Sequence, residues 1–110
     1  MIAFVATPTF LKNAKVLSKR YPSFKKDLKE LLDSLSENPE QGVSLAGKFR
    51  KIRLAISSKG KGKRGGARVI TTDCVIVQGA GRIVLVSVYD KSDIDSMSVE
   101  EIKKAYSSLS

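Results

Sequence analysis

The sequence predicts an α+β domain in which two helices precede a run of strands and a short helix closes the chain. Apolar residues recur at helical spacing as far as Leu35, the pattern turns to alternation after Gly47, and β-branched runs follow. The predicted order is βααβββα, which is typical of helices segregated from a mainly antiparallel sheet. We expect a helical hairpin packed on four strands, with residues 1–110 forming a single domain.

The two helices follow a short first strand and are bounded by local signals. Thr7 is the predicted N-cap of the first helix, and Pro8 suits its first helical position. Pro22 ends this helix, because the residue before a proline avoids the helical conformation. Ser23 is the predicted N-cap of the second helix, which ends before Pro39. With almost no connection between them, the two helices are expected to form a hairpin.

Three strands are predicted in the second half of the chain. In the first, residues 51–56, apolar and more polar side chains alternate. Residues 67–77 and 83–89 are β-branched runs, separated by a glycine-containing turn that is typical of a hairpin. These strands are expected to carry the candidate site.

The connections around these strands are also predicted. Residues 57–66 read SSKGKGKRGG, a glycine-rich and charged composition that predicts a mobile connection. Replacing its lysines by alanine is therefore expected to leave the thermal stability nearly unchanged. Near the end of the chain, Ser98 and Glu101 have the spacing of a capping box and predict the short closing helix.

Positive charge is concentrated in one part of the sequence. The chain has 20 Lys and Arg against 11 Asp and Glu, a net charge of +9. Residues 48–68 hold nine of the basic residues and no acidic one, which indicates a polyanionic partner. A solubilising loop would explain residues 59–64 alone. The nine are Lys48, Arg50, Lys51, Arg53, Lys59, Lys61, Lys63, Arg64 and Arg68.

Composition also argues against several classes of site. The single cysteine, Cys74, rules out an intrachain disulfide framework, and the absence of histidine makes a zinc site improbable. We expect no metal and no cofactor. No apolar run approaches the roughly 20 residues that span a bilayer, and the first residues do not form a secretory signal. A soluble, cytosolic protein without a membrane partner is expected.

Strand alternation places several charged residues on one face of the sheet. If Ile52 and Leu54 face the helices, then Lys51 and Arg53 face the other side. Arg68 begins the next strand, and its face depends on a register that the sequence does not determine.

The last strand contributes to the same polar face. Val84, Val86 and Val88 are assigned to the core, which leaves Ser87, Tyr89 and Lys91 on the opposite side. The alternative is a solvent-exposed face that merely happens to be basic. The face would present Lys51, Arg53, Arg68, Tyr89 and Lys91 together.

At these residues the sequence resembles a known family. The segments at residues 49–54, 65–70 and 87–92, taken with the order of elements, are similar to toxins of the RelE/ParE superfamily. These are the toxins of type II toxin–antitoxin modules. The Tyr-Asp-Lys-Ser ending and the Gly- and Lys-rich connection look like the HigB-type branch. The resemblance covers nearly the whole chain.

The resemblance implies an activity and a set of residues. RelE-type members cut messenger RNA in the ribosomal A site without a metal, using Lys, Arg and often Tyr. By position, Lys51 and Arg53 match the family's basic pair, Arg68 its strand arginine, and Lys91 a basic residue after the last strand. The family's tyrosine has no match, because its place falls near Met97. Tyr89 is the remaining tyrosine candidate for the general base.

The implied chemistry suits these residue types. The RNA 2′-OH attacks the adjacent phosphorus, and fixed cations stabilise the charge that develops on the phosphoryl oxygens. Arg53 and Arg68 suit a phosphate clamp. Lys51 or Lys91, crowded by like charge, is a candidate base or acid. The expected RNA-backbone contacts are Lys48, Arg50, Lys59, Lys61, Lys63 and Arg64.

Three functional hypotheses therefore remain open at this point. The first is a ribosome-dependent endoribonuclease toxin, with the ribosome, messenger RNA and a cognate antitoxin as partners. The second is a ParE-like inhibitor of DNA gyrase, and the third is a nucleic-acid-binding module without catalysis. The fold alone does not separate them.

Overall fold

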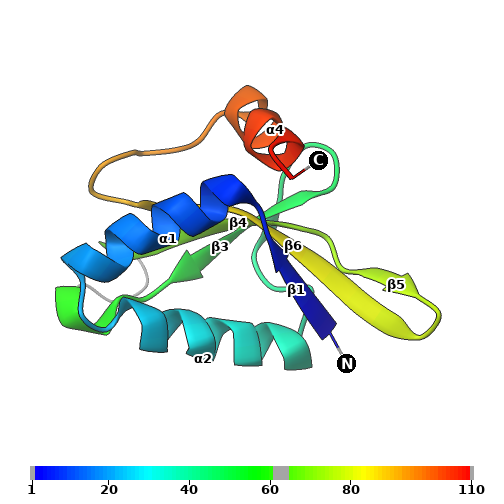
Figure 1. Cartoon of the computed structure of the whole chain (residues 1–110), viewed down its shortest axis with the longest axis horizontal. Helices are drawn as coiled ribbons and strands as arrows, with labels where there is room; N and C mark the ends of the chain where they lie inside the picture. Colours follow the sequence, from blue (N-terminus) through cyan, green and yellow to red (C-terminus); the bar gives the residue numbers. More distant parts are fainter. Residues whose placement is uncertain (1, 61–64, 110) are drawn as a thin grey trace.

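The computed structural model describes residues 2–60 and 65–109 (Figure 1). The helices are α1 (Pro8–Arg20), α2 (Phe24–Glu37) and α4 (Val99–Ser107), with a 3₁₀ turn η1 (Ser57–Lys59). The strands are β1 (Ile2–Ala6), β2 (Val43–Ser44), β3 (Phe49–Leu54), β4 (Ala67–Thr72), β5 (Val75–Val77) and β6 (Ala80–Asp90). The predicted α+β class is confirmed.

The sheet is larger and less uniform than expected. Its strand order is β1-β6-β4-β3-β2, and β5 pairs with β6 beyond the end of β4. β1 runs parallel to β6, whereas the remaining pairs are antiparallel. The described residues thus form a mixed sheet of six strands instead of the predicted four. The sequence did not indicate β2, which is only two residues long.

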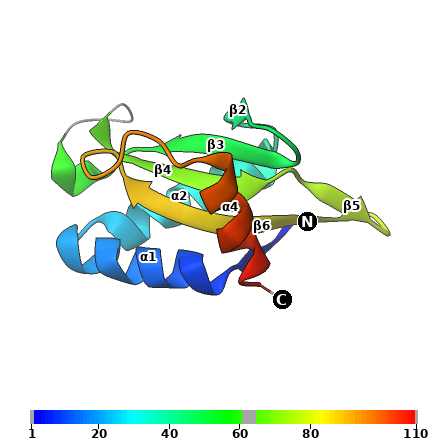
Figure 2. The same ribbon diagram turned by 90° about the horizontal axis from the view of Figure 1, so that it is seen from above.

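Helices cover both faces of this sheet to different extents (Figure 2). The hairpin of α1 and α2 packs on one face through a core that includes Phe10, Leu17 and Phe24. On the other face a smaller cluster around Ile70 and Val86 packs against α4. α4 covers only part of that face (Figure 2).

The helix boundaries follow the local signals in the sequence. The Thr7 side chain accepts a hydrogen bond from the Phe10 amide, and Pro8 begins α1. Ser98 and Glu101 form the predicted capping box of α4. Ser23 precedes α2 as expected, but its hydroxyl does not cap that helix. It donates instead to Asp27, which lies one turn further along.

The predicted strand at residues 67–77 is interrupted. β4 ends at Thr72 and β5 begins at Val75, because Asp73 leaves the ladder and donates its amide to the Lys48 carbonyl. The expected hairpin turn is present between β5 and β6. Gln78 and Gly79 both have positive φ angles, 51° and 80°, as a two-residue type I′ hairpin requires.

A β-bulge in β6 changes which of its side chains face the helical hairpin of α1 and α2. Ile70 pairs with Ser87 but Thr71 pairs with Leu85, so one extra residue lies between the two pairs. The expectation that Val84, Val86 and Val88 share one face is therefore wrong. Val88 packs with the α1–α2 core, whereas Val84 and Val86 pack in the cluster beneath α4.

Candidate functional site

The strand register brings three of the expected site residues into one row. Arg53 on β3 lies opposite Arg68 on β4, and Arg68 lies opposite Tyr89 on β6. Directly opposite residues lie on the same face of a sheet. Lys51, two residues before Arg53, shares that face and lies opposite Ile70. The register thus supplies the face of Arg68, which the sequence had left open.

The solvent exposure of the side chains decreases along the row, from two cations at the surface to a buried pair. Arg53 is exposed and Lys51 is partly exposed, and neither side chain has a hydrogen bond or ion pair within residues 2–60 and 65–109. Arg68 and Tyr89 are each only 7% exposed. The Arg68 guanidinium donates to the Ala67 carbonyl at 3.1 Å. An anion reaching this face would meet the two exposed cations first and the buried pair behind them.

Tyr89 carries a buried hydroxyl that nothing in the described part of the chain satisfies. Burial raises the pKa of this phenol, while the charge of Arg68 and the backbone of Met97 act in the opposite direction. The hydroxyl therefore stays protonated near neutral pH. A protonated phenol in this position is suited to donate a hydrogen bond, not to act as a general base.

Met97, near which the resemblance to RelE/ParE toxins would place a tyrosine, has an apolar side chain. The Met97 sulfur accepts a hydrogen bond from the Ser87 hydroxyl at 3.1 Å, and Met97 packs against the cluster beneath α4. Its contribution is packing, and the sulfur offers no proton for transfer. The missing tyrosine therefore has no substitute at that position.

Lys91 follows β6 at the same end of the sheet as the row. Its amide donates to the Gly66 carbonyl, just before β4 begins. Its ammonium group bonds the backbone oxygen of Asp95 at 2.9 Å and the Asp95 carboxylate at 3.4 Å. Asp95 is fully exposed, so this pair is weak and the Lys91 side chain is free to reorient.

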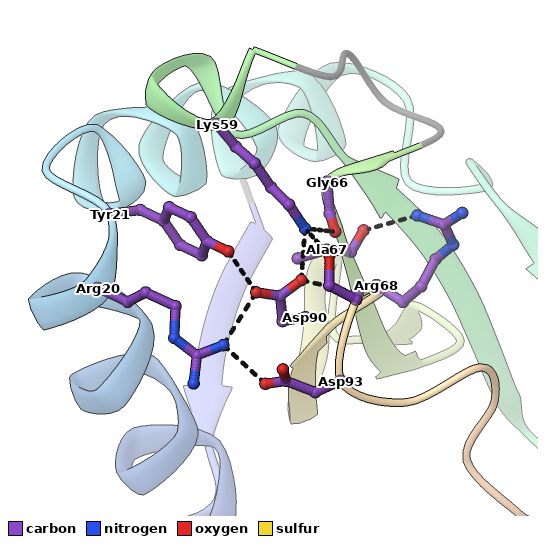
Figure 3. Close-up of polar contacts among 9 residues, drawn as sticks. Arg20, Tyr21, Lys59, Gly66, Ala67, Arg68, Asp90 and Asp93 are labelled. Carbon is purple, nitrogen blue, oxygen red and sulfur yellow. Dashed lines mark hydrogen bonds and ion pairs between the residues drawn. The ribbon is translucent and has the colours of Figure 1, made fainter.

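A second charged group, the Asp90 cluster, lies behind this end of the sheet (Figure 3). We define it as Arg20, Tyr21, Lys59, Asp90 and Asp93. The Asp90 side chain is only 1% exposed and accepts from Lys59 at 2.5 Å, Tyr21 at 2.5 Å and Arg20 at 3.0 Å. The Ser92 amide also donates to it, at 2.9 Å. Arg20 forms a further, more exposed pair with Asp93.

Asp90 therefore ties together segments that are distant in sequence. Its partners come from the end of α1, from η1 and from the residues after β6. Burial alone would raise the pKa of Asp90, but these hydrogen bonds outweigh burial and hold the pKa well below its usual range. Because Asp90 directly follows Tyr89, the cluster fixes the end of β6 that carries the site. Sequence reasoning assigned Asp90 no role.

Several expected RNA contacts have other partners. Lys59 is not on a free loop: its side chain is 8% exposed and paired with Asp90. Arg50 donates to the backbone carbonyls of Glu40, Gln41 and Gly42, and it pairs with Asp73. Both side chains therefore have structural partners in the fold, and their contact with RNA stays a prediction.

The remaining expected contacts are placed differently. Lys48 bonds the Tyr106 hydroxyl at 2.9 Å, at the opposite end of β3 from Arg53. Residues 57–59 form a 3₁₀ turn, which contradicts the expected mobile connection at its start. The Ser57 amide, at the start of this turn, donates to the buried carboxylate of Asp27. Lys61, Lys63 and Arg64 lie outside the described residues.

Lys59→Ala is accordingly expected to destabilise the fold, contrary to the expectation from sequence. The change leaves Asp90 buried with one cationic partner fewer, and we expect a loss of about 1 to 3 kcal/mol in the free energy of unfolding. Lys12→Ala, at an exposed position on α1, is the matched control and should change little. Urea unfolding followed by circular dichroism measures both. An equal effect in the two variants would contradict the buried pairing.

No protein-family model matches the sequence. In the part of the chain that the structure describes, no helix is long and apolar enough to cross a membrane. Within the same residues, no group of three or more His, Cys, Asp and Glu side chains is arranged to hold a metal ion.

Proposed function

We propose that the protein is a ribosome-dependent endoribonuclease, the toxin of a type II toxin–antitoxin module. The single observation that carries the proposal is the row formed by Arg53, Arg68 and Tyr89, with Lys51 on the same face. Two guanidinium groups and a buried, unsatisfied hydroxyl form a set of donors for a phosphodiester. The resemblance to RelE/ParE toxins points to Lys51, Arg53 and Arg68, but not to Tyr89.

The residues divide into three roles in the proposed reaction. Arg53 and Arg68 hold the non-bridging oxygens of the scissile phosphate. Tyr89, kept protonated by its raised pKa, donates a hydrogen bond to an oxygen whose charge grows in the transition state. Lys51 in its neutral form accepts the 2′-OH proton as the 2′-oxygen attacks phosphorus.

The leaving group completes the reaction. As the bond from phosphorus to the 5′-oxygen breaks, Lys91 releases Asp95 and donates a proton to that oxygen. The products are a 2′,3′-cyclic phosphate and a 5′-OH, and no external oxidant or reductant is needed. Because the nucleophile is the 2′-OH, DNA is not a substrate. In the cytoplasm, the proposed partners are the translating ribosome, its messenger RNA and a cognate antitoxin.

Primer extension on a translated messenger tests the proposal. The purified full chain is added to a reconstituted translation reaction, and discrete cuts that require ribosomes are expected. Intact RNA together with cleaved DNA in a gyrase assay would support the ParE-like alternative instead. Binding without cleavage of either nucleic acid would indicate a non-catalytic module.

The pH dependence of cleavage is a further prediction. The sequence has no histidine, so the rate should show no inflection near pH ~6.5, where an unperturbed histidine titrates. It should rise toward alkaline pH, because the lysine proposed as base acts only after losing its proton. Single-turnover rates across pH test this, with the ribosomes checked for integrity at each pH. A bell-shaped profile centred near neutrality would contradict a lysine base.

A further inference from the structure

A groove lined by residues of both helices lies between α1 and α2. It encloses about 680 Å³, and its floor includes Leu11, Ala14 and Leu28. Leu11 is 60% exposed, although most large apolar side chains of the two helices pack into the core. On α1, Leu11 and Ala14 are three residues apart and therefore lie on one side of the helix. We call these apolar lining residues the floor of the groove and its lysines the walls.

The walls of this groove carry only positive charge. Lys15, Lys19 and Lys25 line it, and no acidic residue does. The surrounding surface has the same sign, because every lysine of residues 2–29 is exposed. The one acidic residue in that range, Asp27, is 5% exposed and is bound to Ser23 and Ser57. The exposed lysines are Lys12, Lys15, Lys19, Lys25, Lys26 and Lys29.

This second basic surface is separate from the basic stretch at residues 48–68. The charge count outside residues 48–68 conceals it, because the 11 basic residues there are balanced by 11 acidic residues, most of which follow Glu30. It is also separate from the candidate site. The groove belongs to the helical hairpin, whereas the row of Arg53, Arg68 and Tyr89 lies on the opposite face of the sheet.

We propose that the groove binds an acidic amphipathic helix of a partner protein. An apolar strip flanked by cations fits a helix whose leucine-like side chains enter the groove while its carboxylates pair with the lysines. A nucleic-acid backbone would use the lysines but would leave the exposed side chain of Leu11 without a partner. The floor therefore favours protein over RNA. If the protein is the toxin proposed above, this partner is the antitoxin. That identification rests on the proposed function, whereas the binding of an acidic helix to the groove does not rest on it.

A peptide probe tests the groove directly. The probe is a synthetic helix with leucines along one face and glutamates on both flanks, and the control is a scrambled peptide of the same composition. Titration of the isotopically labelled full chain is expected to shift the amide resonances of α1 and α2. The scrambled peptide, which has the same charge but no apolar face, should bind at least tenfold more weakly.

Matched variants test the contributions of the apolar floor and of the lysine walls to peptide binding separately. Leu11→Ser should weaken binding of the probe by roughly tenfold, a difference of about 1.4 kcal/mol. Val16→Ser removes a half-exposed apolar side chain from the same helix, outside the groove, and should not change the affinity for the probe. Lys15→Glu with Lys19→Glu should weaken binding more than Lys12→Glu with Lys29→Glu, which changes the net charge equally.

Two results would overturn the proposal. Equal binding of the helical and scrambled peptides would show that charge alone attracts them. An RNA oligonucleotide that shifts the groove resonances while the helical peptide does not would identify an RNA surface. Ribosome-dependent cleavage is measured in parallel on Leu11→Ser, which should cut messenger RNA normally. Peptide binding without any cleavage by the wild type would refute only the proposed enzyme function.

Discussion

Asp90→Asn is expected to lower the free energy of unfolding by about 3 to 5 kcal/mol, the typical cost of breaking a buried ion pair from one side. The change keeps the size of the side chain but removes its charge. Lys59, whose side chain is 8% exposed, then remains buried without its anion. Because asparagine has a single acceptor oxygen, one of the two carboxylate positions, that of Lys59 or that of Tyr21 and Arg20, also loses its acceptor. Denaturant unfolding at neutral pH, followed by circular dichroism, measures the loss.

Asp93→Asn provides the matched control. Asp93 also pairs with Arg20, at 2.7 Å, but its side chain is 52% exposed. An exposed pair contributes about 1 kcal/mol or less, so this variant should remain close to wild type. If both variants lost the same stability, the burial of Asp90 would not be the cause, and the description of the cluster would be wrong.

The same carboxylate should make the protein sensitive to acid. The pKa of Asp90 is lower in the folded protein than in the unfolded chain, where an aspartate titrates near ~3.9. Its contribution is therefore complete above that pH and is lost as the pH falls toward the folded value. The wild type should lose stability steeply below pH ~4, and Asp90→Asn should lose less over the same interval. Parallel slopes would show that other carboxylates, such as Asp27, dominate the acid response.

The parts of the fold that the sequence predicted are those with local causes. Thr7 and Pro8 begin α1, and Pro22 ends it, through interactions within a few residues. The hairpin turn at Gln78 and Gly79 likewise depends on two adjacent residues. The cap of α2 shows the limit of such reasoning. Ser23 has a suitable residue type, but Asp27 and Ser58 compete for its hydroxyl, and Ser58 is 35 residues away.

The parts that the sequence did not predict depend on distant partners. The β-bulge at Val86 is a property of how β6 aligns with β4, and a regular β-branched run gives no sign of it. Lys59 looks like a loop lysine until Asp90, 31 residues later, is seen beside it. The face of Arg68 is another case, since it follows from pairing with Arg53 and Tyr89. Alternation predicts which residues share a face only where a strand is regular, and the pairing with neighbouring strands decides what those residues contact.

Arg68→Ala is expected to reduce the rate of messenger cleavage by on the order of 10²–10³, by analogy with the loss of one donor to a transition-state oxyanion. Arg68 lies in the middle of the row, opposite both Arg53 and Tyr89, and is 7% exposed. Its guanidinium is held by the Ala67 carbonyl, which fixes its direction before a substrate arrives. Cleavage rates in a reconstituted translation reaction, at saturating ribosomes, measure the effect.

Because Arg68 is buried, its replacement needs variants that separate chemistry from folding. Lys91→Ala alters a side chain that is 33% exposed, so it should remain folded and still lose most of the cleavage activity as the leaving oxygen loses its proton donor. Arg68→Lys keeps the charge without the planar fork and should retain intermediate activity. Arg82→Ala removes an exposed arginine from the other end of β6 and should cleave normally. Full activity in the Arg68→Ala, Lys91→Ala double variant would place the chemistry elsewhere on the molecule. Loss of activity in Arg82→Ala as large as in Lys91→Ala would instead indicate general electrostatic binding to RNA, with no defined catalytic row.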